Sequence, residues 1–161
     1  MSMDLDEQYD KIYRYCFFRL RHRETAEDIT QETFLRFFES TTYRNTGQAL
    51  RYLYTIARNL CTDEFRKPRM EQLTDSISEH FSDETADDEP PEGKILNRIS
   101  MARSLSGLTE ADRELLLLRY VNEVPLSVIS SLTGISRFAV YRRLLLAKEH
   151  LKENLRKENI I

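Results

Sequence analysis

The apolar residues of this chain recur at helical intervals instead of alternating as they do in strands. In the first half, three segments carry them every three or four residues, which places them on one face of an α-helix. The first segment spans residues 5–20. The second begins at Thr25, where Asp28 is placed to complete a capping box, and the third runs from Leu50 to a stop at Pro68. We therefore expect three helices in the N-terminal half.

Helical signals form a second group in the C-terminal half. A short helix is expected near Ile95, and Thr109 is placed to cap a helix that contains four consecutive leucines. Ser127 is placed to cap a short helix, Gly134 supplies a tight turn, and Ser136 is placed to cap the last helix. The core face of that last helix is predicted to carry Val140, Leu144, Ala147, Leu151 and Leu155.

The segment between the two groups is strongly acidic. Residues 71–92 hold nine Asp and Glu residues and no Lys or Arg, together with two consecutive prolines, a composition typical of a solvated linker. The whole chain has a net charge of −3, but without this segment 24 basic residues stand against 18 acidic ones, a net charge of +6. We predict an all-α protein of two small helical domains, residues 1–70 and 94–161, joined by a flexible acidic linker at 71–93.

Composition argues against several other classes of protein. The chain has 4 Gly and 4 Pro among 161 residues, which favours long helices over a turn-rich β fold. No apolar run approaches the roughly 20 residues that span a bilayer, and the acidic N-terminus lacks the order of a secretory signal, so we expect a cytoplasmic protein. Cys16 and Cys61 are expected to be buried small hydrophobes, not a disulfide or zinc ligands. No catalytic constellation, metal site or cofactor-binding motif is evident, so we expect neither an enzyme nor a small-molecule substrate.

The last two predicted helices form a candidate helix-turn-helix. A short helix, a glycine turn and a longer basic helix follow the order in which a bracing helix precedes one that enters the major groove of DNA. Residues 134–157 carry seven Lys and Arg against two Glu. An ordinary amphipathic surface helix has a similar composition, but the order of the elements favours DNA binding. Phe138, Arg142 and Leu145 are expected to point away from the core face.

Two features of the N-terminal half have both a functional and a structural interpretation. Residues 51–69 interleave basic and aromatic side chains. That pattern is typical of a surface for single-stranded nucleic acid, although a surface helix with aromatic residues in the core has it too. Residues 24–38 place polar side chains beside phenylalanines. Charges on a helix are usually solvated, whereas an exposed aromatic neighbour such as Phe34 would mark a protein-docking patch.

Together these motifs resemble those of the extracytoplasmic-function sigma factors, the group IV members of the sigma-70 family of bacterial RNA polymerase. Region 2.2 of that family resembles AEDITQETFLRFF, and its regions 2.3–2.4 resemble LRYLYTIARNLCTDEFRK. Region 4 resembles LTEADRELLLLRYVNEVPLSVISSLTGISRFAVYRRLLLAKEHL. The similarity covers both halves and omits the linker and the termini. Each motif alone is weak, whereas their order and spacing are specific.

The resemblance implies a factor that binds core RNA polymerase at its clamp helices and flap, reads the −35 promoter element as duplex DNA and opens the −10 element. It also implies control by an anti-sigma factor that wedges between the two domains. Core-polymerase contacts would come from Asp28, Gln31, Glu32 and Phe34. Contacts to −10 DNA would come from Arg44, Tyr52, Arg58, Asn59, Asp63 and Arg66. Contacts to −35 DNA would come from Ser136, Arg137, Phe138, Tyr141, Arg142, Arg143 and Leu145.

The resemblance also assigns roles within the −10 set. Asn59 would hydrogen-bond an extruded base, and Arg58 and Arg66 would neutralise phosphates. In the −35 helix the family usually has Thr and then Lys or Arg where this chain has Ala139 and Tyr141. We therefore expect a −35 preference different from the usual one.

Two alternatives stand beside the sigma-factor interpretation. A stand-alone helix-turn-helix regulator usually dimerises to match paired half-sites and needs no N-terminal domain of this type. A sigma-like protein that titrates an anti-sigma factor without reading DNA usually carries a receiver domain or loses the basic helix. This chain keeps basic residues in both halves, which favours a factor that contacts DNA.

Overall fold

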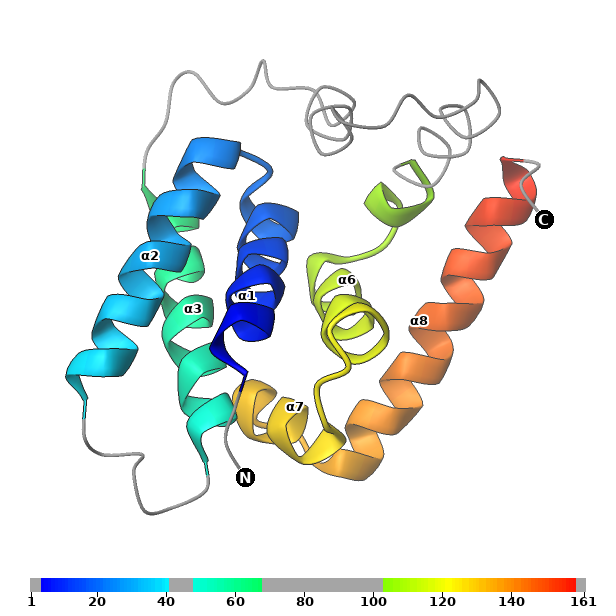
Figure 1. Ribbon diagram of the computed structural model, residues 1–161. Coiled ribbons are helices and arrows are strands. Elements are labelled where there is room, and N and C mark those ends of the chain that lie inside the picture. The colour runs from blue at the N-terminus through cyan, green and yellow to red at the C-terminus, as the bar shows by residue number, and fades with distance from the viewer. Residues whose placement is uncertain (1–3, 41–47, 68–102, 159–161) are drawn as a thin grey trace.

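The computed structural model describes residues 4–40, 48–67 and 103–158, and every element assigned within these ranges is helical. The predicted all-α fold is confirmed, while the linker and the helix expected near Ile95 lie outside the described residues. The helices form two groups (Figure 1), which we call the N-terminal lobe (residues 4–67) and the C-terminal lobe (residues 103–158). The N-terminal lobe holds α1 (Leu5–Leu20), α2 (Arg23–Glu39) and α3 (Ala49–Arg66). The C-terminal lobe holds α6 (Glu110–Leu116), the π-helix η2 (Leu117–Val121), α7 (Leu126–Thr133) and α8 (Arg137–Lys157).

Side-chain caps set the starts of the first two helices. The carboxylate of Asp4 accepts a hydrogen bond from the backbone N–H of Glu7 and caps α1. At the start of α2, Nδ1 of His22 accepts a hydrogen bond from the backbone N–H of Thr25. The start predicted at Thr25 is therefore wrong: the histidine takes the capping position, and the helix begins at Arg23. By contrast, α3 ends just before the proline that was expected to stop it.

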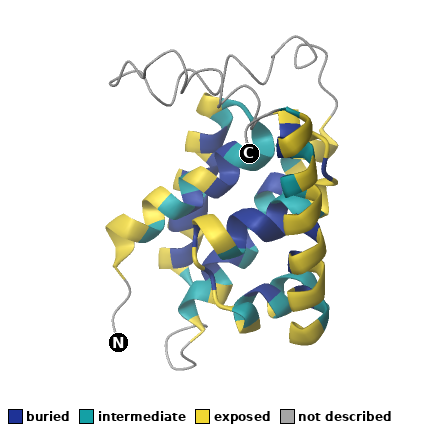
Figure 2. Cartoon of the chain, turned by 90° about the vertical axis from the view of Figure 1, so that its right-hand side faces the viewer, coloured by how far each residue is buried: buried dark blue, intermediate teal, exposed yellow. Residues whose placement is uncertain are grey.

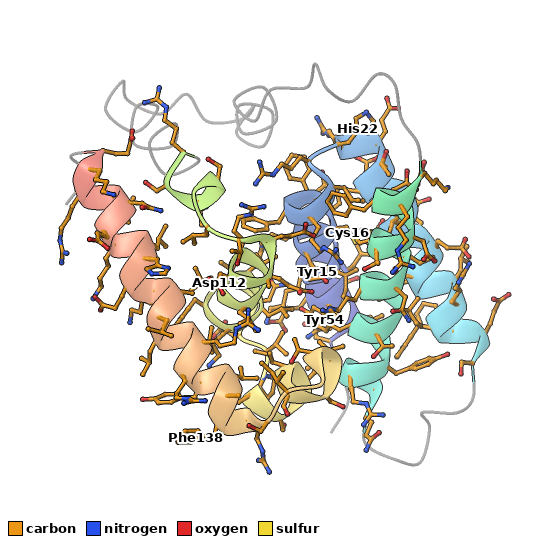
Figure 3. The ribbon with its side chains drawn as sticks, turned by 180° about the vertical axis from the view of Figure 1, so that it is seen from behind. Tyr15, Cys16, His22, Tyr54, Asp112 and Phe138 are labelled. Carbon is orange, nitrogen blue, oxygen red and sulfur yellow. The ribbon has the colours of Figure 1, made fainter. Side chains whose placement is uncertain are left out.

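The interior of the N-terminal lobe combines large aromatic rings with small side chains. Tyr15 and Tyr54 are almost fully buried and meet edge to face, with ring centroids 5.9 Å apart. Cys16 and Cys61 are free, buried thiols joined by a hydrogen bond, and this bond together with burial raises the pKa of Cys61. Figure 3 labels Tyr15, Cys16 and Tyr54 on the inward sides of their helices. The prediction that both cysteines are buried small hydrophobes is confirmed.

A run of leucines forms the centre of the C-terminal lobe. Thr109 caps α6 as predicted, because its hydroxyl accepts a hydrogen bond from the backbone N–H of Asp112. The single helix expected after this cap continues as the π-helix η2, in which the N–H of Asn122 donates to the carbonyl of Leu117. The wider turn places Asn122 in the interior, where it is 1% exposed. All four leucines of the run are buried: Leu115, Leu116, Leu117 and Leu118.

Helices α7 and α8 form the predicted helix-turn-helix. The cap expected at Ser127 is wrong, because α7 begins directly after Pro125 and has no side-chain cap. At its end Gly134 takes a left-handed backbone conformation with φ 79°, which glycine adopts without the strain of a Cβ. Oγ of Ser136 then accepts a hydrogen bond from the backbone N–H of Ala139 and caps α8, as predicted.

The two lobes lie side by side, with α8 on the outer edge of the C-terminal lobe (Figure 1). Helices α3 and α7 are in contact across the boundary, and the buried residues of both lobes belong to one cluster. Figure 2 shows exposed residues along the outer side of α8 and buried residues toward the middle of the molecule. The predicted inner face of α8 is confirmed: Val140, Leu144, Ala147 and Leu155 are buried, and Leu151 is half-buried.

Within the described ranges, no helix is long and apolar enough to cross a membrane.

Replacing Thr109 by Ala should lower the free energy of unfolding by about 1 kcal/mol, because the N–H of Asp112 loses its capping acceptor. Thr109→Asn should retain nearly all the stability, since asparagine caps as well as threonine. Urea unfolding followed by circular dichroism measures both. Equal stability of the alanine and asparagine variants would contradict the capping role.

Candidate nucleic-acid and polymerase interface

The outer face of α8 exposes aromatic and aliphatic side chains among arginines. Phe138 is 69% exposed and Tyr141 is 51% exposed. The guanidinium of Arg142 lies over the ring of Phe138, 5.3 Å from its centroid. Figure 3 shows Phe138 at the N-terminal end of α8, on the side turned away from the other helices. The predicted outward direction of Phe138, Arg142 and Leu145 is confirmed.

The other residues predicted for −35 DNA differ in how freely they extend from α8. Arg137 is exposed in the first turn. The hydroxyl oxygen of Ser136 accepts the capping hydrogen bond from the backbone N–H of Ala139. Nη2 of Arg143 lies 3.4 Å from Oδ1 of Asp112 on α6, so this arginine leans toward its own lobe. Leu146, which was not among the predicted residues, is 63% exposed on the same helix.

On α3, three of the predicted −10 residues share one exposed face. Asn59, Asp63 and Arg66 recur at intervals of four and three, and all are exposed. Tyr52 begins the same row and is half-buried, with its ring 6.1 Å from that of Phe37. Arg44 lies outside the described residues.

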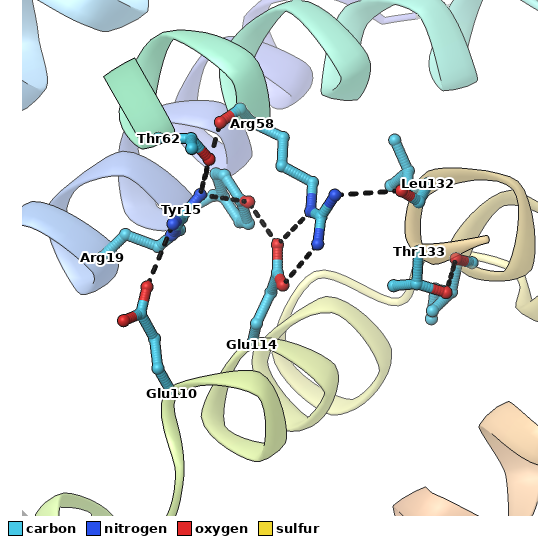
Figure 4. A network of polar contacts seen from close by, with 9 residues as sticks. Tyr15, Arg19, Arg58, Thr62, Glu110, Glu114, Leu132 and Thr133 are labelled. Carbon is cyan, nitrogen blue, oxygen red and sulfur yellow. Dashed lines mark hydrogen bonds and ion pairs between the residues drawn. The ribbon is translucent and has the colours of Figure 1, made fainter. Parts of the chain in front are cut away.

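Arg58 points away from that row and toward the C-terminal lobe. Its Nε donates to Oε2 of Glu114 at 2.8 Å, and its Nη2 donates to Oε1 of Glu114 at 3.3 Å. Its Nη1 donates to the carbonyl of Leu132 at 3.0 Å. The hydrogen bond to Glu114 is the largest cause of a raised pKa for Arg58, and together with the charge of that carboxylate it outweighs the lowering of the pKa by burial. In this arrangement the C-terminal lobe accepts a hydrogen bond from each nitrogen of the Arg58 guanidinium (Figure 4), and a contact of Arg58 with −10 DNA stays a prediction.

The carboxylate of Glu114 has further partners on α1. It accepts a hydrogen bond from the hydroxyl of Tyr15, whose pKa is raised by burial and then by the charge of Glu114. Arg19 lies next to this pair and donates from Nη2 to Oε1 of Glu110 at 3.0 Å. Burial alone would lower the pKa of Arg19, but the neighbouring Tyr15, Glu114 and Glu110 raise it. Figure 4 shows this chain of contacts running from α1 and α3 to α6.

A second polar contact between the lobes surrounds Asn122. Its Nδ2 donates to the carbonyl of Lys11 at 2.9 Å and to the hydroxyl of Tyr54 at 3.0 Å. Its Oδ1 accepts from Nη1 of Arg14 at 3.1 Å. Burial raises the pKa of Tyr54 to about 12, although the bond to Asn122 acts in the opposite direction. The side-chain amide of Asn122 therefore uses both its donor and its acceptor atoms on the N-terminal lobe.

The outer face of α2 carries the residues predicted to contact polymerase, with one correction. Asp28 and Gln31 are exposed, and Glu32 pairs with Nε of Arg36 at 2.8 Å. Phe34 is only 7% exposed, and its ring lies 5.3 Å from that of Tyr9, which is itself 36% exposed. The docking contact expected of an exposed Phe34 is therefore wrong. The exposed apolar side chains of α2 are Leu35 and Phe38.

Known proteins similar to this chain point to one family. The family model described as Sigma-70 region 2 matches residues 5–70, and that described as Sigma-70 region 4 matches residues 98–151. The chain belongs to the sigma-70 family, in its extracytoplasmic-function group. It is an RNA polymerase sigma factor.

Named relatives of this sigma factor span most of its length. The RNA polymerase sigma factor YlaC of Bacillus subtilis is 27% identical over 94% of this chain and 89% of its own length. The extracytoplasmic-function sigma factor SigW of the same species is 27% identical over 94% of this chain and 87% of its own. BldN of Streptomyces coelicolor, also named an extracytoplasmic-function sigma factor, is 31% identical over 84% of this chain and 52% of its own.

Within this sigma factor, most of the predicted site residues lie on three surfaces, whereas Phe34 is buried and Arg58 is half-buried between the lobes. Of the −35 set, Arg137, Phe138, Tyr141, Arg142 and Leu145 are exposed on α8, while Ser136 caps this helix and Arg143 pairs with Asp112. Asn59, Asp63 and Arg66 share a row on α3. Asp28 and Gln31 share the outer side of α2. Arg58 alone joins the contact between the lobes.

Sequence reasoning missed the partners of Arg58. Glu114 directly precedes the buried leucines on a short helix, and a carboxylate in that position needs a cationic partner once it is buried. That signal predicts a partner without saying which residue supplies it. The sequence does not indicate that Asn122 is buried, because only the π-turn before it places its side chain in the interior.

Phe34→Ala should lower the free energy of unfolding by about 3–5 kcal/mol, because it removes a buried ring. Phe38→Ala removes a ring that is 54% exposed and should cost less than about 1 kcal/mol. Chemical denaturation of the two variants beside the parent chain measures the difference. The assignment of Phe34 to the interior would be wrong if both variants lost the same stability.

Proposed function

We propose that this sigma factor directs transcription initiation by reading the −35 element as duplex with α8 and opening the −10 element with α3 while it is bound to core RNA polymerase. The observation that carries the proposal is the division of α8 into two faces. One face is buried against its own lobe, and the other leaves Arg137, Phe138 and Tyr141 exposed after a tight glycine turn. The factor catalyses no reaction by itself and takes no cofactor or small-molecule substrate. It acts in the cytoplasm.

The chemistry of the exposed α8 face suits a DNA major groove that includes thymine. Arginines supply phosphate contacts and bidentate contacts to guanine. Aromatic and aliphatic side chains such as Phe138 and Leu145 can make apolar contacts with the C5-methyl group of thymine, a group that forms no hydrogen bonds. The Arg142 guanidinium lies above the Phe138 ring, so we expect these two side chains to enter the groove together, next to each other.

The exposed row on α3 suits a melted strand. Asn59 offers both a donor and an acceptor to the edge of an extruded base. Arg66 supplies charge to the backbone. Asp63 would repel phosphates, so its carboxylate fits the amino group of an adenine or cytosine better than the backbone.

The outer side of α2 suits the clamp helices of core polymerase, with the flap as the partner of the C-terminal lobe. Asp28 and Gln31 supply a polar rim, and Leu35 and Phe38 supply exposed apolar surface on the same helix. A rim of this kind beside apolar anchors is the usual composition of a protein interface.

An anti-sigma factor is the second protein partner that we propose. The exposed apolar side chains of α8, including Phe138, Leu145 and Leu146, offer it a hydrophobic surface that DNA would otherwise cover. To wedge between the lobes, such an inhibitor must first separate α3 from α7.

Run-off transcription with core polymerase on a promoter library tests the function. We expect specific initiation with both proteins present and none with either alone. The selected sequences should show separate −35 and −10 preferences at a fixed spacing. Tight, sequence-specific binding of the free chain to intact duplex, with no transcription in the presence of core enzyme, would contradict the proposal.

Asp28→Ala and Gln31→Ala should each weaken binding to core polymerase by about fivefold, the effect of about 1 kcal/mol at an interface rim. Both positions are exposed, so the fold should not change. Glu24→Ala, at another exposed acidic position of α2, is the control and should bind as the parent does. Binding is measured by titrating labelled sigma factor with core enzyme, and equal affinities for all four proteins would remove α2 from the interface.

Tyr141→Lys should change the preferred −35 base, because a lysine at this exposed position of α8 reaches guanine acceptors that tyrosine reads poorly. The discrimination gained should be about 1–3 kcal/mol. Val121→Lys adds the same charge at an exposed position outside α8 and should leave the preference unchanged. Sequencing of transcripts from the promoter library gives both preferences. An identical −35 preference for Tyr141→Lys and the parent chain would show that Tyr141 does not face the bases.

A further inference from the structure

Each of the three nitrogens of the Arg58 guanidinium donates a hydrogen bond to the C-terminal lobe in this arrangement, which leaves two of its five N–H groups unused. Nε and Nη2 bind the two carboxylate oxygens of Glu114, and Nη1 binds the carbonyl of Leu132. A bidentate pair of this kind has the geometry with which arginine also binds a phosphate. Glu114 therefore occupies, from the C-terminal lobe, the position that a DNA phosphate would take on α3.

The surroundings of Glu114 keep it in this position. Its side chain is 9% exposed, and a buried carboxylate is stable only when it is paired and hydrogen-bonded. Arg58 supplies the charge, and the Tyr15 hydroxyl supplies a further donor. Separation of the lobes would return the carboxylate to water and release the guanidinium at the same moment.

Two flanking contacts fix the same arrangement of the lobes. On one side, Arg19 of α1 binds Glu110 of α6. On the other, Asn122 binds the carbonyl of Lys11 and the hydroxyl of Tyr54. Since the bonds come from both α1 and α3, neither helix alone determines the register. The contact is specific for one relative placement of the lobes.

The polar bonds of this contact, which lie beside apolar packing shared by both lobes, are the part for which water and other ligands compete. Buried ion pairs recover little more than their desolvation cost, so water competes well for the same groups when the lobes separate. Contacts between domains that are rich in polar groups usually permit relative motion. A strong competitor for Arg58, such as a nucleic-acid phosphate, can therefore replace Glu114.

We propose that Glu114 and its partners Arg58 and Tyr15 form an autoinhibitory clasp, in which the C-terminal lobe acts as an internal phosphate mimic and withholds Arg58 from −10 DNA. This inference rests on the proposed function, which places Arg58 on the −10 surface. The partner of the clasp is the chain itself, so the free protein is inhibited without any anti-sigma factor. The clasp opens when the lobes separate on core polymerase, and Arg58 then contacts the melted strand.

The clasp is tested by binding of the full chain, without polymerase, to a fluorescent single strand carrying the −10 sequence selected in run-off transcription. Glu114→Gln keeps the size of the side chain and removes the charge that holds Arg58. We expect it to bind the strand about tenfold more tightly than the parent, because the charged Glu114 carboxylate no longer competes with the DNA phosphate for Arg58. The slope of log affinity against log salt should become steeper by about 0.7, the value for one added phosphate contact on a single strand.

Glu153→Gln is the matched control, because it removes the same charge from an exposed position of α8 in the same lobe. It should bind like the parent, with the same salt slope. Adding Arg58→Ala to Glu114→Gln should abolish the gain, since the released guanidinium is the group that binds. Glu110→Gln alters an exposed partner of Arg19, which leaves the interior intact, and should produce a smaller gain in the same direction.

The outcomes separate the clasp from the proposed function. Circular dichroism shows whether each variant keeps its helices, and Glu110→Gln decides the question if Glu114→Gln does not fold. Folded variants that bind the strand no better than Glu153→Gln would overturn the clasp. If the parent still supports run-off transcription in that case, the sigma-factor function stands without it. A parent chain that fails in run-off transcription would refute the function itself.

Discussion

The ion pair between Arg58 and Glu114 is the constraint on which the arrangement of this molecule depends. Both groups belong to helices that would be complete without it, one in each lobe. Once the lobes meet, the carboxylate loses its water and must keep its charge paired. The same placement of the lobes also forms three other sets of hydrogen bonds: that of the Tyr15 hydroxyl, that of the Leu132 carbonyl and those of Asn122. The contact therefore joins the two lobes that carry the surfaces we propose for DNA.

Neighbouring residues on α3 illustrate how one helix serves two surfaces. Asn59 is exposed on the row that we assign to the melted strand, while Arg58, one position earlier, faces the other lobe. A helix turns by about 100° per residue, so adjacent side chains belong to different faces. The α8 helix divides in the same way, with Val140 buried and Tyr141 exposed. Opening of the lobes changes the environment of Arg58 and leaves the exposed row of α3 as it is.

Features that depend on a few neighbouring residues could be predicted from the sequence. The caps at Thr109 and Ser136 and the inner face of α8 are local, and the structure agrees. The misplaced start of α2 has a physical cause, because a histidine nitrogen accepts the capping hydrogen bond and histidine is not one of the residues from which a cap is usually predicted. Phe34 and Phe38 lie one helical turn apart, so the apolar pattern alone could not decide which is buried. The bond from Arg58 to Glu114 joins segments far apart in the chain, and no local pattern predicts it.

The most direct test measures the distance between the lobes in the free protein and on core polymerase. Spin labels at Glu24→Cys on α2 and Glu153→Cys on α8 are attached at exposed positions, whereas the native Cys16 and Cys61 are buried. Pulsed dipolar spectroscopy should give one narrow distance for the free chain and a clearly longer one when core enzyme is added. A broad distribution in the free chain, or the same narrow distance in a transcriptionally active complex, would contradict a clasp that opens on the polymerase.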